Sequence, residues 1–449
     1  MTLLGYQNFY LVGIKGVAMT ALAQCLLDAG KNISGSDVKE EFVTQKILND
    51  RNIKIDIGFE HDIPQNIDVL IYTAAHGGPD NPLVKQAKTK NIPTLSHAQA
   101  LAKLFNDKKG IAVSGVGGKS TVSAMITWIL EKTKTPSSFA VGVGDIIGLN
   151  KTGQWNEKSE YFVAEADEYV VDPAAREKGE EIIARFSYLK PHIAICTNLK
   201  FDHPDVYDNF DHTKKIFTKF FENIKPEGYL LINKHDQELI NLAKKIKHLR
   251  ADIKIQKYSL DELDIQLNVP GKFNMLNAQV AVKACLLMGI DKKEAIAAIK
   301  SFQSTRRRFE FIGEKNRVKY YDDYAHHPDE IKAVIQTLNN LYPKRRIVYA
   351  FQSHTFSRTK KLFSGFVDSF AKAKEVVMID IFASAREKAD SSISSDLLCQ
   401  RIKEKYLSIK TKNLKNIDNL AKYCQKDLHE GDILITLGAG DIYQVHDRI

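Results

Sequence analysis

The sequence predicts an α/β protein built on parallel sheets, and two observations indicate this class. Short apolar runs alternate with helical patterns along the whole chain of 449 residues, which is typical of repeated strand–helix–strand units. Two of these runs end in glycine-rich turns that lead directly into helices. At roughly 100–200 residues per domain, the length indicates two to four such domains.

The predicted elements fall into three blocks, each opened by a strand. The first has strands at 9–14, 32–37 and 68–75 and a helix at 19–30. The second has strands at 110–115, 161–164 and 192–197 and a helix at 120–134. The third has strands at 346–352, 375–382 and 432–440. We place the boundaries near 107 and 306, which gives predicted domains at 1–107, 108–305 and 306–449.

Composition narrows the class of protein. An apolar content of 44% and a charged content of 27% are those of a globular protein, and no apolar run approaches the 18 or so residues of a membrane span. The N-terminal residues lack the layout of a secretory signal, and the five cysteines are scattered, so we expect a cytoplasmic protein with reduced thiols. The net charge of +9 is spread along the chain, which favours a solvated lysine-rich surface or a polyanionic substrate over nucleic acid.

The stretch SGVGGKST, residues 114–121, has the composition of a phosphate-binding loop. It follows an apolar strand and opens a helix, where backbone N–H groups and the positive helix end attract phosphates. The spacing is shorter than the general pattern, with Val116 and Gly117 alone between Gly115 and Gly118. We expect Lys119 to reach the β- and γ-phosphates and the Ser120 hydroxyl to bind Mg²⁺, with Thr121 completing the loop.

Two later motifs place polar groups where such a site needs them. EADE, 165–168, ends an apolar strand, so the Glu165 carboxylate is suited to Mg²⁺. TNLKFDH, 197–203, puts Asp202 and His203 at the carboxyl end of another strand, where ligands bind in open α/β sheets.

The first glycine-rich turn leaves two classes of ligand open. Gly13 and Gly16 follow the first strand, and Asp37 lies about 20 residues further on, as in a dinucleotide-binding domain. An NAD-dependent oxidoreductase would explain these three residues. It would leave the phosphate loop, Glu165 and His203 without a role.

The shortened loop and several other motifs resemble those of the Mur ligase family, whose members are ATP-dependent amide-bond ligases of peptidoglycan synthesis. The similar segments are GIKGVAMTALA (13–23), GVGGKST (115–121), GKFNMLNA (271–278), TRRRFE (305–310), DDYAHHPDE (322–330) and FQSHTFSRT (351–359). The resemblance covers nearly the whole chain. It implies a three-domain architecture: a Rossmann-like N-terminal domain, a central phosphate-loop ATPase domain and a Rossmann-like C-terminal domain.

The resemblance also implies roles for single residues. It places Asn274 and Asn277 near the adenine of ATP, Asp323 on the ribose, and Arg308, with Arg307 close behind, on the phosphates. It places Tyr324, His326 and the catalytic His327 at the reacting groups, and His354 and Arg358 at the substrate. In the first domain it implies a uridine nucleotide sugar held by Gly13, Lys15, Gly16, Asp37 and Thr73, with Lys15 near the pyrophosphate. Phe273 and Thr355 stand where the family pattern has His and Arg.

The implied reaction uses ATP and Mg²⁺. One Mg²⁺ would be held by Ser120 and Glu165 and a second by His203. The implied partners are UDP-N-acetylmuramate and L-alanine, with no nucleic acid and no membrane insertion.

The incoming amine stays open at this stage. The segment FQSHTFSRT and the segment 380–387 resemble the branch of the family that adds L-alanine, which we favour. EADEY (165–169), the insert 174–191, NLKFDH and RRRFE resemble a branch that attaches a recycled tripeptide to the same nucleotide. A non-catalytic nucleotide-binding regulator is a further alternative, because several family positions are altered.

Overall fold

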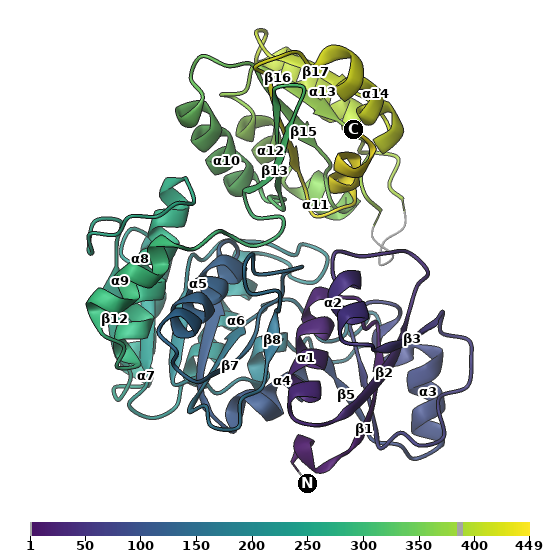
Figure 1. Ribbon diagram of the computed structural model, residues 1–449, viewed down its shortest axis with the longest axis vertical. Coiled ribbons are helices and arrows are strands. Elements are labelled where there is room, and N and C mark those ends of the chain that lie inside the picture. Colours follow the sequence, from purple (N-terminus) through teal and green to yellow (C-terminus); the bar gives the residue numbers. More distant parts are fainter. Residues whose placement is uncertain (1, 384–388) are drawn as a thin grey trace. The chain divides into compact units, whose positions relative to one another are not determined.

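The computed structural model describes residues 2–383 and 389–449 (Figure 1). The chain divides into two compact units. Unit 1 comprises residues 1–201, 206–268 and 274–305, and unit 2 comprises 202–205, 269–273 and 306–449. Residues 384–387 of the segment 380–387, which bears on the incoming amine, lie outside the described residues. Among the described helices, none is long and apolar enough to cross a membrane.

Unit 1 contains a parallel N-terminal sheet. Its strands are β1 (Asn8–Val12), β2 (Asn32–Asp37), β3 (Lys54–Ile57), β4 (Val69–Tyr72) and β5 (Thr94–Ser96), in the order β3-β2-β1-β4-β5. Its helices are α1 (Val17–Asp28), α2 (Gln45–Asp50), α3 (Pro82–Thr89) and α4 (His97–Asn106), with short 3-10 turns η1 (Leu3–Gly5) and η2 (Gly78–Asp80). The strand ends that follow β1, β2 and β4 meet at one edge, as parallel pairing requires.

Unit 1 also contains a larger sheet that carries the phosphate loop. Its strands are β6 (Lys109–Ser114), β7 (Ser137–Ala140), β8 (Gly153–Gln154), β9 (Tyr161–Glu165), β10 (Ile193–Cys196), β11 (Tyr229–Asn233) and β12 (Lys254–Tyr258). The order is β12-β11-β10-β6-β9-β7-β8, and only β8 is antiparallel. Its helices are α5 (Lys119–Lys132), α6 (Phe210–Glu222), α7 (Gln237–Leu249), α8 (Lys272–Leu287) and α9 (Lys292–Lys300), with η3 (Arg185–Tyr188). The central strands are buried along their length, as expected for a sheet covered by helices on both faces.

Helix α1 joins the two sheets of unit 1. It lies against β7 and β8 (Figure 1). A Cβ atom added at Gly153 would lie 1.9 Å from the Ala21 carbonyl oxygen, so this close approach requires glycine. The Gln24 amide donates to Thr152 Oγ1 at 2.8 Å, and Cys25 Sγ lies 3.2 Å from the Phe139 carbonyl oxygen. One continuous hydrophobic cluster therefore runs from the N-terminal sheet into the larger sheet.

Unit 2 is built on a third sheet. Its strands are β13 (Glu310–Lys315), β14 (Val318–Asp323), β15 (Ile347–Phe351), β16 (Glu375–Met378), β17 (Lys410–Asn413) and β18 (Ile433–Leu437). The order is β13-β14-β18-β15-β16-β17, and all pairs except β13–β14 are parallel. Its helices are α10 (Pro328–Leu341), α11 (Phe356–Lys361), α12 (Phe363–Ser369), α13 (Ser395–Lys405) and α14 (Ile417–Asp427), with η4 (Ile442–Arg448). Hydrophobic clusters on both faces of this sheet bury its central strands.

The α/β class predicted from the sequence is confirmed, and the strands and helices of the three blocks are present. Most boundaries differ by one to three residues. The largest difference is β16, which ends at Met378 although the apolar run continues to Phe382. The division into 1–107, 108–305 and 306–449 stays a prediction, since the two units are defined by contacts and the first two sheets share one unit.

Candidate active site

The phosphate loop connects β6 to α5 and depends on two glycines in left-handed conformation. Gly115 has φ of 116°, and a Cβ atom there would lie 2.3 Å from Thr197 Oγ1. Gly118 has φ of 88°, and a Cβ atom there would lie 2.8 Å from Asn277 Oδ1. Other residues would be strained and obstructed at both positions. Asn277, expected near the adenine, therefore lies against the phosphate loop, and Asn274 is buried on the same helix α8.

The residues after β10 hold the loop in shape. Asn198 Oδ1 accepts from the backbone N–H groups of Val116 and Gly117, at 2.9 and 3.2 Å. The Asn198 amide and the Thr197 hydroxyl both donate to the Gly117 carbonyl oxygen. In this structure the Gly117 N–H group is therefore used inside the loop. The contact of the loop N–H groups with phosphates stays a prediction, and the N–H groups of the first turn of α5 are further donors suited to that role.

Lys119 is the first residue of α5, and its ammonium is held by a carboxylate. Nζ lies 2.8 Å and 3.1 Å from the two carboxylate oxygens of Glu168, a side chain that is 2% exposed. Burial alone would lower the pKa of Lys119, but the charges of Glu168 and Asp167 outweigh it and raise this pKa. The ammonium is thus a permanent positive charge at the helix N-terminus.

Glu165 ends β9 on the strand beside the phosphate loop. Its Oε1 accepts from the Gly142 N–H at 2.8 Å, which fixes the carboxylate against the segment that follows the neighbouring strand β7. Ser120, on the first turn of α5, is 3% exposed. A hydroxyl and a carboxylate are hard oxygen ligands, so the donor set fits Mg²⁺.

The N-terminal turn between β1 and α1 differs from the phosphate loop. Gly13 has φ of 80°, and a Cβ atom there would lie 2.4 Å from Thr73 Cγ2, so this turn and the end of β4 approach closely. Gly16 follows as the N-cap residue of α1.

The side chains of Lys15 and Asp37 are used inside the protein. Lys15 is 3% exposed, and its ammonium donates to the carbonyl oxygens of Val38 and Glu40, at 2.9 and 2.8 Å. The Asp37 carboxylate accepts from the N–H groups of Lys15 and Val38. The Lys15 ammonium thus binds the loop after β2, and its expected position near the pyrophosphate stays a prediction.

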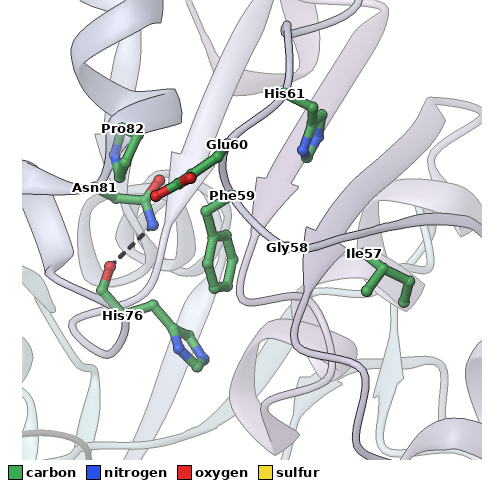
Figure 2. A pocket seen from close by; sticks show the side chains of 8 residues that line it. All are labelled: Ile57, Gly58, Phe59, Glu60, His61, His76, Asn81 and Pro82. Atoms are coloured by element: carbon green, nitrogen blue, oxygen red, sulfur yellow. Dashed lines mark hydrogen bonds between the residues drawn. The ribbon is translucent and has the colours of Figure 1, made fainter.

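A cavity of about 510 Å³ opens at the carboxyl edge of the N-terminal sheet (Figure 2). Phe59 and His61 line it from the loop after β3, and His76 and Asn81 line it from the loop before α3. The rings of Phe59 and His76 lie 4.8 Å apart at 35°. Asn81 fixes its own loop, since its side-chain amide donates to the His76 carbonyl oxygen and its Oδ1 accepts from the Leu83 N–H.

Unit 2 gives Arg307 and Arg308, two of the three arginines of TRRRFE, different surroundings. Arg307 is buried, pairs with Asp322 at 3.1 Å and donates to the carbonyl oxygens of Gly438 and Gly440. Arg308 is only partly buried, with its guanidinium 4.9 Å from the centre of the Tyr324 ring. The arrangement makes Arg307 a structural residue and supports the choice of Arg308 for the phosphate contact.

The segment DDYAHHPDE, residues 322–330, forms the end of β14 and the start of α10. Asp323 accepts from the N–H groups of Phe309 and Ala325, and its burial raises the pKa of this carboxyl to about 7. Burial lowers the pKa of His326 to about 4. His327 is the N-cap residue of α10, with its Nδ1 accepting from the Asp329 N–H. Nδ1 of His327 is therefore occupied by the hydrogen bond that caps α10.

Arg358 is enclosed by polar partners. Its Nε lies 2.9 Å from Asp202 Oδ1, and its Nη1 lies 3.4 Å from His354 Nδ1. Although burial favours a protonated Asp202, the charge of Arg358 holds the pKa of Asp202 well below its ordinary value. His203 has a left-handed backbone, φ 58°, and its Nε2 lies 3.7 Å from Asp202 Oδ2. His203 belongs to unit 2, and its relation to Ser120 and Glu165 stays a prediction.

Two residues at the phosphate loop had no assigned role in the sequence analysis. Glu168 holds Lys119, and Asn198 holds the loop backbone. Both lie in motifs already singled out, EADE and TNLKFDH. The role of Glu168 could have been inferred from the sequence, because a lysine at a helix N-terminus needs a nearby counter-charge and EADE contains two carboxylates besides Glu165.

Family models match the chain in three consecutive stretches. The Mur ligase family catalytic domain matches residues 8–109, the Mur ligase middle domain matches 113–285, and the Mur ligase glutamate ligase domain matches 307–440.

Named relatives cover nearly the whole chain. The chain is 37% identical to a UDP-N-acetylmuramate–L-alanine ligase of Clostridium kluyveri, over 98% of this chain and 97% of that protein. It is 36% identical to the same-named enzyme of Clostridium acetobutylicum, over 98% and 96%. A crystal structure of a UDP-N-acetylmuramate-alanine ligase from Thermotoga maritima aligns with a TM-score of 0.78 and 23% identity, over 99% and 98%. A crystal structure of a murein peptide ligase from Psychrobacter arcticus aligns with a TM-score of 0.71 and 20% identity, over 98% of both chains. These two structures share the fold.

Proposed function

The chain belongs to the Mur ligase family, and on that premise we propose that it joins L-alanine to the carboxylate of UDP-N-acetylmuramate with hydrolysis of ATP, in the cytoplasm. The identity of 36–37% over nearly the full length of enzymes that bear this name carries the proposal. The phosphate loop supports it independently, because a lysine stands at a helix N-terminus after a glycine-rich turn, and both groups attract phosphates.

The reaction has two group transfers. An oxygen of the acceptor carboxylate attacks the γ-phosphorus of ATP, the new O–P bond forms as the bond to ADP breaks, and an acyl phosphate results. The amine nitrogen of L-alanine then attacks the acyl carbon, and phosphate leaves with the electrons of the C–O bond as the amine loses a proton. The first step brings two anions together, so catalysis there is mostly positioning and charge neutralisation.

Named residues supply that neutralisation. Lys119 contributes the positive charge at the phosphate loop, and Arg308 contributes a partly exposed guanidinium from unit 2. Asn274, Asn277 and Asp323 are proposed for the nucleoside. Tyr324, His326, His327, His354 and Arg358 are proposed for the reacting groups and the substrate.

Ser120 and Glu165 would hold Mg²⁺, with His203 proposed for a second ion. When bound, Mg²⁺ neutralises charge on the phosphates. Glu165→Gln should raise the Mg²⁺ concentration needed for half-maximal rate, since an amide is a poorer ligand for a hard cation. An unchanged Mg²⁺ requirement would remove Glu165 from the metal site.

The N-terminal domain is proposed to bind the uridine nucleotide through the turn at Gly13 and Gly16 and the strand end at Thr73. Asp37 speaks against the oxidoreductase alternative. The residue is 1% exposed and each carboxylate oxygen accepts from a backbone N–H group, so in this structure the carboxylate supports the turn rather than facing outward toward a dinucleotide ribose.

The proposal is tested with purified protein, ATP, Mg²⁺ and UDP-N-acetylmuramate. L-alanine or the murein tripeptide is added in separate reactions, and phosphate release and product mass are measured. We expect phosphate release and a new amide with L-alanine. A product with the tripeptide alone would transfer the assignment to tripeptide addition, and NAD binding without turnover would reject the ligase.

A further inference from the structure

Residues 171–183, which we call the strap, lie between the carboxylates of EADE and strand β10. The base of the strap is closed by backbone pairing: the Val171 N–H donates to the Ile183 carbonyl oxygen at 2.9 Å, and Val170 and Ala184 form an antiparallel bridge. Arg185 pairs with Asp167 at 2.6 Å immediately outside it. The two ends of the strap are therefore held together by backbone pairing, next to the EADE segment, whose Glu168 carboxylate contacts the phosphate loop.

The strap is ordered by its own hydrogen bonds. Asp172 Oδ1 accepts from the Ala174 N–H, and the Glu180 N–H donates to the Ala175 carbonyl oxygen. The Ala175 side chain is buried. Such internal packing is that of a compact surface loop with a defined conformation.

Lys178 connects the strap to the N-terminal sheet. Its ammonium lies 2.8 Å from Asp172 Oδ2 within the strap and 2.5 Å from Asp80 Oδ2 on η2. Hydrogen bonds to these two carboxylates raise the pKa of Lys178, and the one to Asp172 has the larger effect. One ammonium therefore bridges two segments that are far apart in sequence.

Asp80 belongs to a loop whose backbone needs support. His76, Gly77 and Gly78 have φ of 54°, 85° and 53°, which is three consecutive residues in left-handed conformation. Gly77 and Gly78 adopt this conformation without strain, whereas at His76 it costs energy and persists because the surroundings fix it. Inside the loop, the Asn81 side chain binds the His76 carbonyl oxygen (Figure 2), and from outside it Lys178 binds Asp80.

The same loop forms one wall of the cavity at the sheet edge. His76 and Asn81 line the cavity, and Asp80 immediately precedes Asn81 (Figure 2). We propose that the strap is a positioning element for the acceptor nucleotide: through Lys178 and Asp80 it fixes the loop 76–81 and so sets the affinity of the N-terminal domain for the acceptor. This inference rests on the proposed function, which places the acceptor in that domain.

The test compares four variants of the full-length protein: Lys178→Ala, Asp80→Ala, the double variant, and Arg176→Ala as the matched control. Arg176 lies on the same strap but pairs with Asp208, away from the loop. Calorimetry measures UDP-N-acetylmuramate and ATP separately, and amide hydrogen exchange reports on residues 76–81.

We expect Lys178→Ala to raise the Kd for the acceptor about three- to fivefold, since a partly exposed ion pair contributes modestly. Exchange in 76–81 should accelerate, and the ATP affinity should stay unchanged. Asp80→Ala should do the same, the double variant should add nothing, and Arg176→Ala should match the wild type. Equal acceptor affinity in Lys178→Ala and Arg176→Ala would overturn the strap proposal while leaving the ligase assignment intact. Wild-type protein that binds no UDP-N-acetylmuramate would overturn both.

Discussion

The two glycine-rich turns of unit 1 look alike in sequence and differ in what holds their lysines. Each follows the first strand of its sheet and leads into a helix. The ammonium of Lys15 is buried on two backbone carbonyl oxygens, whereas that of Lys119 is held by the carboxylate of Glu168. A lysine on a glycine-rich turn therefore does not by itself indicate a ligand contact, and the partner of the ammonium decides its role.

The difference follows from position. Lys15 precedes the N-cap residue of α1, so its side chain extends toward the loop after β2. Lys119 is the first residue of α5, at the positive end of a 14-residue helix, where a second positive charge requires a counter-charge. Glu168 supplies that charge in the protein, and a phosphate can supply it in a complex.

The largest expected effect comes from Lys119→Ala. We expect the rate of phosphate release to fall about 10²–10³-fold, because one charge aimed at the transferring phosphoryl group is lost. Lys15→Ala should leave the rate at saturating substrates within a few-fold of wild type. Steady-state kinetics with L-alanine checks both variants, and near-normal turnover of Lys119→Ala would remove the phosphate loop from the reaction.

A smaller effect is expected from Glu168→Gln, which keeps the shape of the side chain and removes its charge. The rate should fall about ten- to hundredfold, since a charge-assisted hydrogen bond contributes about 1.5–3 kcal/mol. The Glu168 charge helps to raise the pKa of Lys119, so the basic limb of the pH–rate profile should move to lower pH. If the rate fell by the same factor at every pH and the basic limb stayed at its wild-type pH, Glu168 would act only on the stability of the protein.

The sequence predicted the α/β class, the phosphate loop and the carboxylate strand end, because these depend on local patterns. Gly115 and Gly118 were identifiable since only glycine fits those turns. The partners of Lys15 were not, because the carbonyl oxygens of Val38 and Glu40 carry no sequence signal. Asn198 was missed for a related reason: its role depends on the distance between β6 and β10, which no local pattern reports.

Lys15→Met sharpens the comparison at the first turn. Methionine fills similar space but leaves two carbonyl oxygens without their donor, so the free energy of unfolding should fall by about 1–3 kcal/mol. The affinity for ATP should not change. Chemical denaturation and calorimetry measure the two quantities. If the variant kept full stability but bound UDP-N-acetylmuramate a hundredfold more weakly, Lys15 would lie at the pyrophosphate, as the family resemblance implies.

The smallest expected effect is a change in the free energy of unfolding with pH, which we expect near the first turn and not at the second. His97 Nε2 lies 3.1 Å from the Ala18 carbonyl oxygen on the helix that follows the first turn. Burial lowers the pKa of His97 to about 4; the charge of Arg185 adds to this and that of Asp167 opposes it. Because the folded pKa lies below the unfolded one, the unfolded chain binds a proton first as the pH falls, and stability declines between pH 6.5 and 4.

At pH 5.5 the resulting loss in the free energy of unfolding is about 1–2 kcal/mol, and His97→Gln should remove it, since glutamine can donate to the same carbonyl oxygen and does not titrate. The second turn should contribute nothing in this range, because the pKa of Lys119 is raised and its ammonium stays protonated. Thermal unfolding of the wild type and of His97→Gln between pH 7.5 and 4.5 measures the difference. If the two proteins lost stability in parallel as the pH fell, the acid sensitivity would arise elsewhere and the first turn would be as insensitive to pH as the second.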